Sequence, residues 1–264
     1  MKVYISVDIE GTAGTTSWAS TNLGDKEHAA AAREMTLEAV AACQGAIEAG
    51  ATEIYVKDAH DSGRNMDLSL FPKEARVIFD WSLTPDSMVA GLDSSFDALM
   101  FVGYHSPAGL PGSPLCHTMN RGNNYVKING SLASEFLLHA YTGASRGVPS
   151  VFVSGDQMLC DHVKQHDPAI TAVAVKESLG RATINLPTDL ACEKIRQGAR
   201  EALEHSDLRP MAVPELLTLE INYKDHFKAL HASYYPGVKM LDDFTVSYTA
   251  HSMDELMTAR MFIL

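Results

Sequence analysis

The sequence predicts an α/β fold, a doubly wound and mainly parallel sheet accompanied by a second, smaller α+β domain. Three observations support this prediction. Uninterrupted apolar runs, such as those at 3–7 and 98–103, are typical of strands buried on both faces of a parallel sheet. A helical segment joins the first run to a second strand, and such a unit forms a right-handed crossover between parallel strands. Acidic residues and histidines follow the runs, at the strand ends where open α/β sheets bind ligands.

The first part of the chain alternates strands and helices. A turn at 11–14 follows the opening strand, and residues 26–49 are rich in Ala, Glu, Met and Leu, which favour a helix that Gly50 ends. The further elements expected here are strands at 52–57, 75–79 and 98–103 and a short helix at 85–92.

From Cys116 to Ile128, the expected strands are shorter than those in the first part of the chain. Short strands are expected at 116–119 and 125–128, then a turn at Asn129-Gly130, and a helix from near Ser131 to about residue 144 that carries Glu135. The remaining elements expected are a strand at 148–154, a helix at 157–166 capped by Asp156, a strand at 172–175, a helix at 187–205, a strand at 216–223, a helix at 225–231, a strand at 245–249 and a helix at 252–262.

The kinds of element suggest two domains. Residues 1–113 and 147–210 would form the doubly wound domain, and residues 114–146 and 211–264 the smaller α+β domain, which is then discontinuous in sequence.

The composition restricts the partners. The chain has 21 basic and 33 acidic residues in 264, a net charge of −12. Nucleic acids and anionic membranes require basic patches, so neither is an expected partner. An acidic protein suits a site for cations or for the ammonium group of a substrate.

The cysteines and the uncharged segments bear on location. Four cysteines without CxxC spacing predict reduced thiols in a cytoplasmic protein. The residues before Asp8 are too few for a signal peptide. The longest stretch without charged residues, 98–120, contains prolines and histidines and is not a membrane span.

Five residues with metal-binding side chains stand near strand ends or a helix start: Asp8, Glu10, His60, His105 and Glu135. Carboxylates combined with imidazoles suit zinc or a similar first-row metal. Five ligands exceed one tetrahedral zinc site, whereas two metals that share a carboxylate would use all of them and leave a position for water.

The same residues lie within a series of short motifs: Ser6–Gly11, Asp58–His60, Gly103–His105, His117–Met119 and Glu135. In this order the series resembles the D-aminopeptidase family of the bacterial dipeptide-transport (Dpp) operon, which are zinc-dependent metallopeptidases. The resemblance implies a dinuclear zinc site on the five residues above, with Asp8 as the bridge and His117 as the catalytic histidine. Cys116 is a departure, since a small hydroxyl residue is expected before that histidine.

The resemblance also implies an activity and an assembly. Members of the family release N-terminal D-residues from short peptides, and they form ring-shaped decamers whose sites face an inner chamber. The expected reaction is attack of a metal-activated water on the scissile carbonyl. His117 would either donate a proton to the leaving amine or stabilise the tetrahedral intermediate.

Two other functions stay open on the sequence. A metal-dependent phosphoesterase can use the same kind of dinuclear site, but it needs basic residues near the metals, and the site loops offer only Arg64 and Arg121. A peptide-binding accessory protein of a transporter would not explain five convergent ligands. A serine hydrolase is disfavoured because the G-x-S-x-G motif is absent.

Overall fold

The computed structural model describes residues 1–205 and 209–264. A seven-stranded sheet with the order β3-β2-β1-β4-β7-β8-β9 forms its centre. The strands are β1 Lys2–Val7, β2 Glu53–Asp58, β3 Ala75–Ile78, β4 Ala98–Tyr104, β7 Ser150–Asp156, β8 Thr171–Leu179 and β9 Ala182–Asn185. Neighbours from β3 to β8 pair in parallel, and β9 pairs antiparallel with β8. The doubly wound, mainly parallel sheet predicted from the sequence is therefore confirmed.

The order of the strands places a switch point beside β1. From β1 the chain proceeds outward to β2 and β3, then returns to the other side of β1 and continues with β4, β7 and β8. Loops that follow β1 and β4 consequently diverge to opposite faces of the sheet and leave a crevice at the carboxyl ends.

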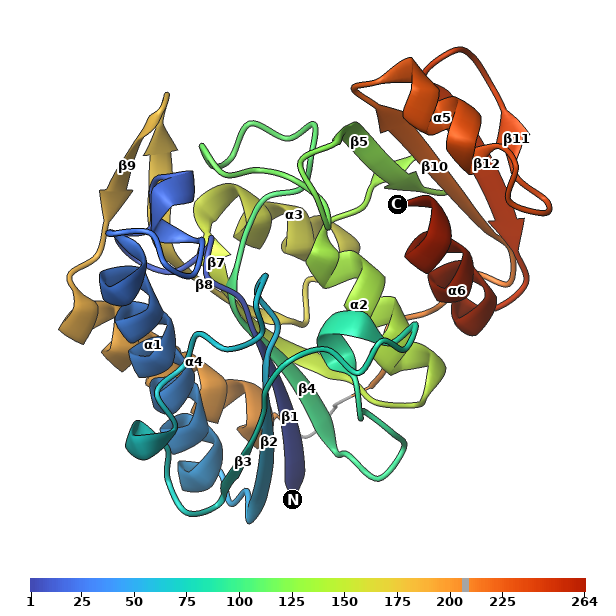
Figure 1. Cartoon of the computed structure of the whole chain (residues 1–264). Coiled ribbons are helices and arrows are strands. Elements are labelled where there is room, and N and C mark those ends of the chain that lie inside the picture. Colours follow the sequence, from blue (N-terminus) through green and yellow to red (C-terminus); the bar gives the residue numbers. More distant parts are fainter. Residues whose placement is uncertain (206–208) are drawn as a thin grey trace.

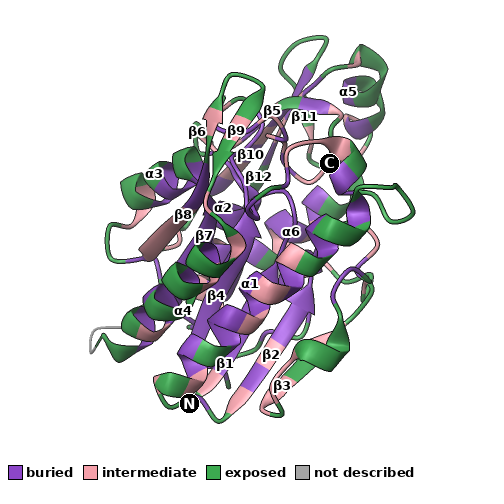
Figure 2. Cartoon of the chain, turned by 90° about the vertical axis from the view of Figure 1, so that its left-hand side faces the viewer, coloured by how far each residue is buried: buried purple, intermediate pink, exposed green. Residues whose placement is uncertain are grey.

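Helices cover both faces of this sheet (Figure 1). Helices α1 (His28–Glu48) and α4 (Thr188–Glu204) pack against each other over one face, where they bury Val3, Ile5 and Val7 of β1. Helices α2 (Glu135–Ser145) and α3 (Gln157–His166) cover the other face. Figure 2 shows buried central strands and helices whose outer sides are exposed. None of the helices in the described part of the chain is long and apolar enough to cross a bilayer.

A second, antiparallel sheet has the order β11-β12-β10-β5-β6 and lies to one side of the large sheet (Figure 1). Its strands and the helices that pack on it are β5 Asn123–Ile128, β6 Ser131–Leu132, β10 Leu217–Tyr223, β11 Lys239–Met240, β12 Thr245–Ala250, α5 His226–Ala232 and α6 Met253–Ile263. This is the smaller α+β part that the sequence predicts.

Helix α2 connects the two parts. Phe136, Leu137 and Ala140 belong to the core beneath the large sheet, whereas Leu138 belongs to the core of the small one. We propose that 1–113 with 147–210 and 114–146 with 211–264 are the two domains, with α2 as their shared contact.

Several local predictions were wrong. Cys116 and His117 lie in a loop, and only an isolated bridge between Thr118 and Asn120 remains of the strand expected there. The helix expected from near Ser131 begins at Glu135, because residues 131–132 pair with β5 instead. The segment 85–92 forms a single 3₁₀ turn at residues 87–89, since the left-handed backbone of Ser87 (φ 50°) interrupts any longer helix.

Candidate metal centre

The residues singled out in the sequence come together at the carboxyl ends of the central strands. Asp8 and Glu10 follow β1, His60 follows β2 and His105 follows β4. Glu135 is the first residue of α2. Asp8 and Glu10 are two positions apart, a spacing that would place both side chains on one face if the strand continued. Because β1 ends at Val7, the turn after the strand brings the two carboxylates together instead.

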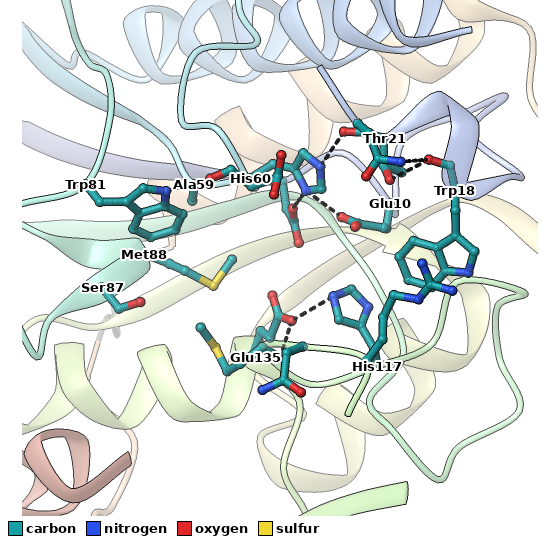
Figure 3. Close-up of a pocket in the computed structure, with 16 residues that line it drawn as sticks. Glu10, Trp18, Thr21, Ala59, His60, Trp81, Ser87, Met88, His117 and Glu135 are labelled. Carbon is teal, nitrogen blue, oxygen red and sulfur yellow. Dashed lines mark hydrogen bonds and ion pairs between the residues drawn. The ribbon is translucent and has the colours of Figure 1, made fainter. Parts of the chain in front are cut away.

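These residues surround a cavity of about 490 Å³. Asp8, Glu10, His60 and Glu135 line it together with His117, as the close-up in Figure 3 shows for the four of these that it labels. His105 lies directly behind this lining and is 1% exposed. Its imidazole stacks on that of His117 with 4.3 Å between ring centres, so His117 separates His105 from the open part of the cavity.

Backbone carbonyls orient all three histidines. Nε2 of His60 lies 2.8 Å from the Thr21 oxygen, Nδ1 of His105 lies 2.9 Å from that of Ser106, and Nδ1 of His117 lies 2.9 Å from that of Leu115. Since a carbonyl can only accept, the ring nitrogen facing it donates, and the other nitrogen faces the carboxylates. Such partners orient the imidazole ligands of metal sites.

Asp8 occupies the middle of the carboxylate cluster. Its Oδ1 lies 3.1 Å from Nδ1 of His60, and its Oδ2 lies 3.5 Å from Nε2 of His105. Glu10 joins the first side, with Oε2 3.0 Å from the His60 nitrogen. Glu135 joins the second, with Oε1 3.5 Å from Nε2 of His105. The two oxygens of Asp8 thus face two separate groups of side chains.

The charged groups of this cluster shift one another's pKa values. Burial raises the pKa of Asp8 well above its usual value, and the neighbouring Glu10 raises it further. Burial also disfavours the charged form of Glu10, but the His60 cation outweighs it and holds the pKa of Glu10 well below its usual value. For Glu135 and His105 burial is again outweighed, because their mutual attraction lowers the pKa of Glu135 to about 2 and raises that of His105 to about 10.

His117 behaves differently from the other two site histidines. Burial lowers its pKa, and repulsion from the neighbouring His105 lowers it further. For His60, burial is outweighed by the Glu10 charge, and the pKa is raised. In the metal-free protein, protonated His60 and His105 therefore neutralise the carboxylates, whereas His117 stays neutral.

Three buried atoms in the cluster have no hydrogen-bond partner in the described part of the chain: Oδ2 of Asp8, Oε2 of Glu10 and Nε2 of His105. Buried polar atoms are rarely left without a partner, and buried carboxylates require positive charge. Donor atoms of Asp8, Glu10 and His105 lie within 4.8 Å of one another, as do those of His105, His117 and Glu135. The donor set therefore fits a metal cation such as zinc, which would displace the protons of the histidines.

Buried polar contacts hold the loop that carries Glu10. The ammonium group of Lys176, from β8, donates to the Glu10 carbonyl and, over 2.6 Å, to that of Thr15. Across the same loop, the Glu38 carboxylate of α1 accepts the backbone N–H of Ala13 at 2.8 Å. Because these partners come from two different elements, the position of Glu10 depends on the assembled fold.

The loops of His60 and His105 are held in a similar way. Asp156 caps α3 through the Leu159 N–H at 2.9 Å, and its other oxygen accepts the N–H of Ser106 at 2.7 Å. Beside β2, the amide of Asn65 donates to the His60 carbonyl and to the Asp58 carboxylate, at 2.8 Å each.

Several cavity residues escape a prediction from the sequence. Both tryptophans of the chain, Trp18 and Trp81, line the cavity, and they lie on opposite sides of the acidic cluster in Figure 3. Met88 also lines it, as does Arg121, one of the two arginines that the sequence places in the site loops. The sequence did contain a signal for the two tryptophans as site residues, because the chain has only two of them and both occur outside the apolar runs that form strands.

Comparisons with known proteins give a consistent family assignment. The model of a family described as D-aminopeptidase matches residues 1–262. A D-aminopeptidase of Bacillus subtilis (strain 168) is 30% identical over 264 residues, which cover 99% of this chain and 96% of that protein. A solved structure, described as the Zn-dependent D-aminopeptidase DppA from Bacillus subtilis, a self-compartmentalizing protease, superposes with a TM-score of 0.94 at 29% identity, covering 100% of this chain and 96% of that one. The chain therefore belongs to the D-aminopeptidase family and is a hydrolase of the metallopeptidase class.

Proposed function

We propose that this protein is a dinuclear zinc aminopeptidase that removes N-terminal amino acids, preferentially D-residues, from short peptides. The observation that carries the proposal is the cluster of buried carboxylates and imidazoles, in which three atoms of the described residues have no hydrogen-bond partner. The preference for D-residues comes from the family and from the relatives, not from a particular side chain.

The metal ligands in this proposal are those predicted from the sequence. Glu10, His60 and one oxygen of Asp8 would hold one zinc, and His105, Glu135 and the other oxygen of Asp8 the second. Support comes from Asp8, whose Oδ1 faces His60 and whose Oδ2 faces His105. A bridging carboxylate of this kind is a common element of paired metal sites.

Bound zinc would supply Lewis-acid chemistry, in which water is activated for attack and negative charge on the carbonyl oxygen is stabilised. His117 is suited to move the proton. Its Nδ1 donates to the Leu115 carbonyl, so in the neutral ring Nε2 carries a lone pair directed at the site. This nitrogen can take a proton from the attacking water and pass it to the leaving amine.

His117 is assigned to catalysis, not to zinc, although its Nε2 lies 3.5 Å from Glu135. The other five residues already suffice for two metals, and His117 lines the cavity whereas His105 lies behind it. Asp61 is the carboxylate of the cavity lining that is not a proposed zinc ligand, and it would attract the free ammonium group of an N-terminus.

The assembly we propose is a ring-shaped decamer in the cytoplasm. The solved relative is described as a self-compartmentalizing protease. Large apolar side chains are exposed on and beside the helices of the small sheet, among them Phe227 at 58%, Tyr234 at 80% and Phe262 at 63%, as is typical of a surface that another chain covers. All four cysteines, which lie within the described ranges, are free thiols, which suits a reducing compartment.

A substrate panel tests the function. It comprises D- and L-aminoacyl amides, their N-acetylated forms and simple phosphate esters, all assayed with the zinc-loaded protein. We expect turnover of the free D-aminoacyl amides, slower turnover of the L-forms, and loss of turnover on acetylation. Equal hydrolysis of acetylated substrates would make the protein an endopeptidase or amidase, and faster hydrolysis of phosphate esters would make it a phosphoesterase.

A further inference from the structure

The charges that line the cavity are distributed unevenly. Four carboxylates face it, from Asp8, Glu10, Asp61 and Glu135, whereas Arg121 is the only lysine or arginine among the described lining residues. Arg64, the other arginine of the site loops, is not part of this lining. Among the described lining residues, a substrate that carries an anionic group therefore has one arginine or lysine side chain to meet.

Arg121 is held in place without a carboxylate partner. Its guanidinium carbon lies 4.2 Å from the centre of the Trp18 ring, in cation–π distance. Within residues 1–205 and 209–264 no acidic side chain forms an ion pair with it, even though the chain is strongly acidic. A guanidinium positioned in this way retains the donors at its edge, which match the two oxygens of a carboxylate.

Trp18 also connects Arg121 to the reaction site. The rings of Trp18 and His117 pack in a T-shaped arrangement, with 5.3 Å between ring centres. The guanidinium carbon therefore lies no farther than about 9.5 Å from the centre of the His117 imidazole, which is the sum of the two ring distances. An extended chain covers roughly 3.3–3.6 Å per residue. One residue beyond the cleaved bond plus a hydrogen bond stays within this limit, and two residues reach it.

We propose that Arg121 binds the C-terminal carboxylate of the peptide, so that di- and tripeptides are the preferred substrates. This rests on the proposed aminopeptidase function and adds a residue that determines substrate length. The ammonium end of the peptide lies near Asp61, the lining carboxylate that is not a proposed zinc ligand, and the carboxylate end lies on the guanidinium stacked on Trp18. A longer peptide places its terminal carboxylate beyond Arg121 and gains nothing from it.

The test compares peptides that differ only at the C-terminus. D-alanylglycine and a pentapeptide with N-terminal D-alanine are each assayed as the free acid and as the C-terminal amide, with zinc-loaded enzyme. Charge-assisted hydrogen bonds of this kind correspond to an effect of about 10- to 100-fold. For the dipeptide we expect kcat/KM of the acid to exceed that of the amide by this factor, whereas the acid and amide of the pentapeptide should differ by less than about 2-fold.

Variants identify the residue responsible. Arg121→Gln should bring the ratio of kcat/KM for the dipeptide acid to kcat/KM for the dipeptide amide down to about 1, and Arg121→Lys should retain part of the preference. Arg64→Gln, which removes the same charge from a neighbouring exposed loop, is the control and should leave the preference intact. Melting temperatures of all variants verify that the fold is retained.

The outcomes separate this inference from the proposed function. If wild type hydrolyses the dipeptide acid and amide at similar rates, the aminopeptidase stands and the role of Arg121 is wrong. The role is also wrong if Arg121→Gln slows acid and amide equally, because Arg121 would then only support Trp18. If wild type hydrolyses none of the four peptides, the proposed function itself fails.

Discussion

At the scale of single residues, orientation distinguishes the histidines of the site. Each histidine donates a hydrogen bond from one ring nitrogen to a backbone carbonyl and directs its other ring nitrogen at the carboxylates. His60 and His105 are held beside Asp8, whereas His117 lies against the open cavity and stays neutral. We therefore propose different roles for these similar side chains, because their surroundings differ.

This difference leads to a prediction for alanine variants. His117→Ala should retain its zinc and lose about 10²- to 10⁴-fold in kcat, the usual effect of removing an acid–base catalyst. His60→Ala and His105→Ala should lose zinc and activity together. His251→Ala, at an exposed position outside the site, is the control. Elemental analysis and steady-state kinetics on the same preparations decide the matter, and release of zinc from His117→Ala would make His117 a metal ligand.

The sequence contained the ligand candidates but not the residues that hold them. Asp8, His60 and His105 are visible because carboxylates and imidazoles are unusual directly after buried strands. Lys176 is not visible in this way, since it lies within a strand and its partner, the Glu10 carbonyl, is 166 residues away in the chain. Contacts to backbone carbonyls leave no pattern of residue types that a sequence could reveal.

At the scale of elements, close packing between α1 and α4 depends on a glycine. A Cβ added at Gly45 in α1 would overlap the backbone carbonyl oxygen of Arg196 in α4. Gly45→Ala should therefore destabilise the protein by about 1–3 kcal/mol, even though alanine normally stabilises the interior of a helix relative to glycine.

Urea unfolding at a fixed zinc concentration measures this effect. Gln44→Ala is the matched control, because the neighbouring side chain is exposed and its removal should change stability by less than about 0.5 kcal/mol. Equal or greater stability of Gly45→Ala would show that the two helices separate easily.

Helix α2 contains a buried histidine, His139, that links stability to pH. Burial and the nearby Arg260 cation lower its pKa from 6.5 to about 4. The unfolded chain therefore binds the proton first on acidification. The stabilising contribution of neutral His139 is complete above pH 6.5 and is lost as the pH falls to about 4, by an amount on the order of 3 kcal/mol.

His139→Gln tests this linkage. Both proteins are unfolded in the metal-free form, because release of zinc also depends on pH. Between pH 6.5 and 4 the free energy of unfolding should fall more steeply for wild type than for the variant. Parallel curves for the two proteins would mean that His139 is already protonated in the folded state or that its charge is compensated.

Elements with strong local signals were predictable, and those defined by a partner were not. The start of α3 at Gln157 follows from the cap Asp156, and the end of α1 follows from Gly50. The short strands β9 and β11 were not predicted, because their pairing with β8 and β12 defines them more than their own composition does. The expected strand at 116–119 failed for the same reason: no neighbouring strand pairs with it among the described residues.

At the scale of the whole molecule, the proposed decamer accounts for the exposed apolar side chains on and beside α5 and α6. A ring with its sites in a chamber would admit short peptides and exclude folded proteins. Light scattering at the concentration of the activity assay should give the mass of a decamer. A fully active monomer would contradict the proposed assembly and leave the exposed Phe227 and Phe262 without a structural explanation.

The central claim is that buried donors at the carboxyl ends of β1, β2 and β4, together with Glu135, bind two zinc ions that are required for hydrolysis. Titration of the chelated protein with zinc, with D-aminoacyl amide hydrolysis as the readout, tests it most directly. Activity should rise until about two equivalents per chain are bound and then level off, because five ligands exceed one tetrahedral site. Full activity at one equivalent, or activity that is independent of zinc, would contradict the account.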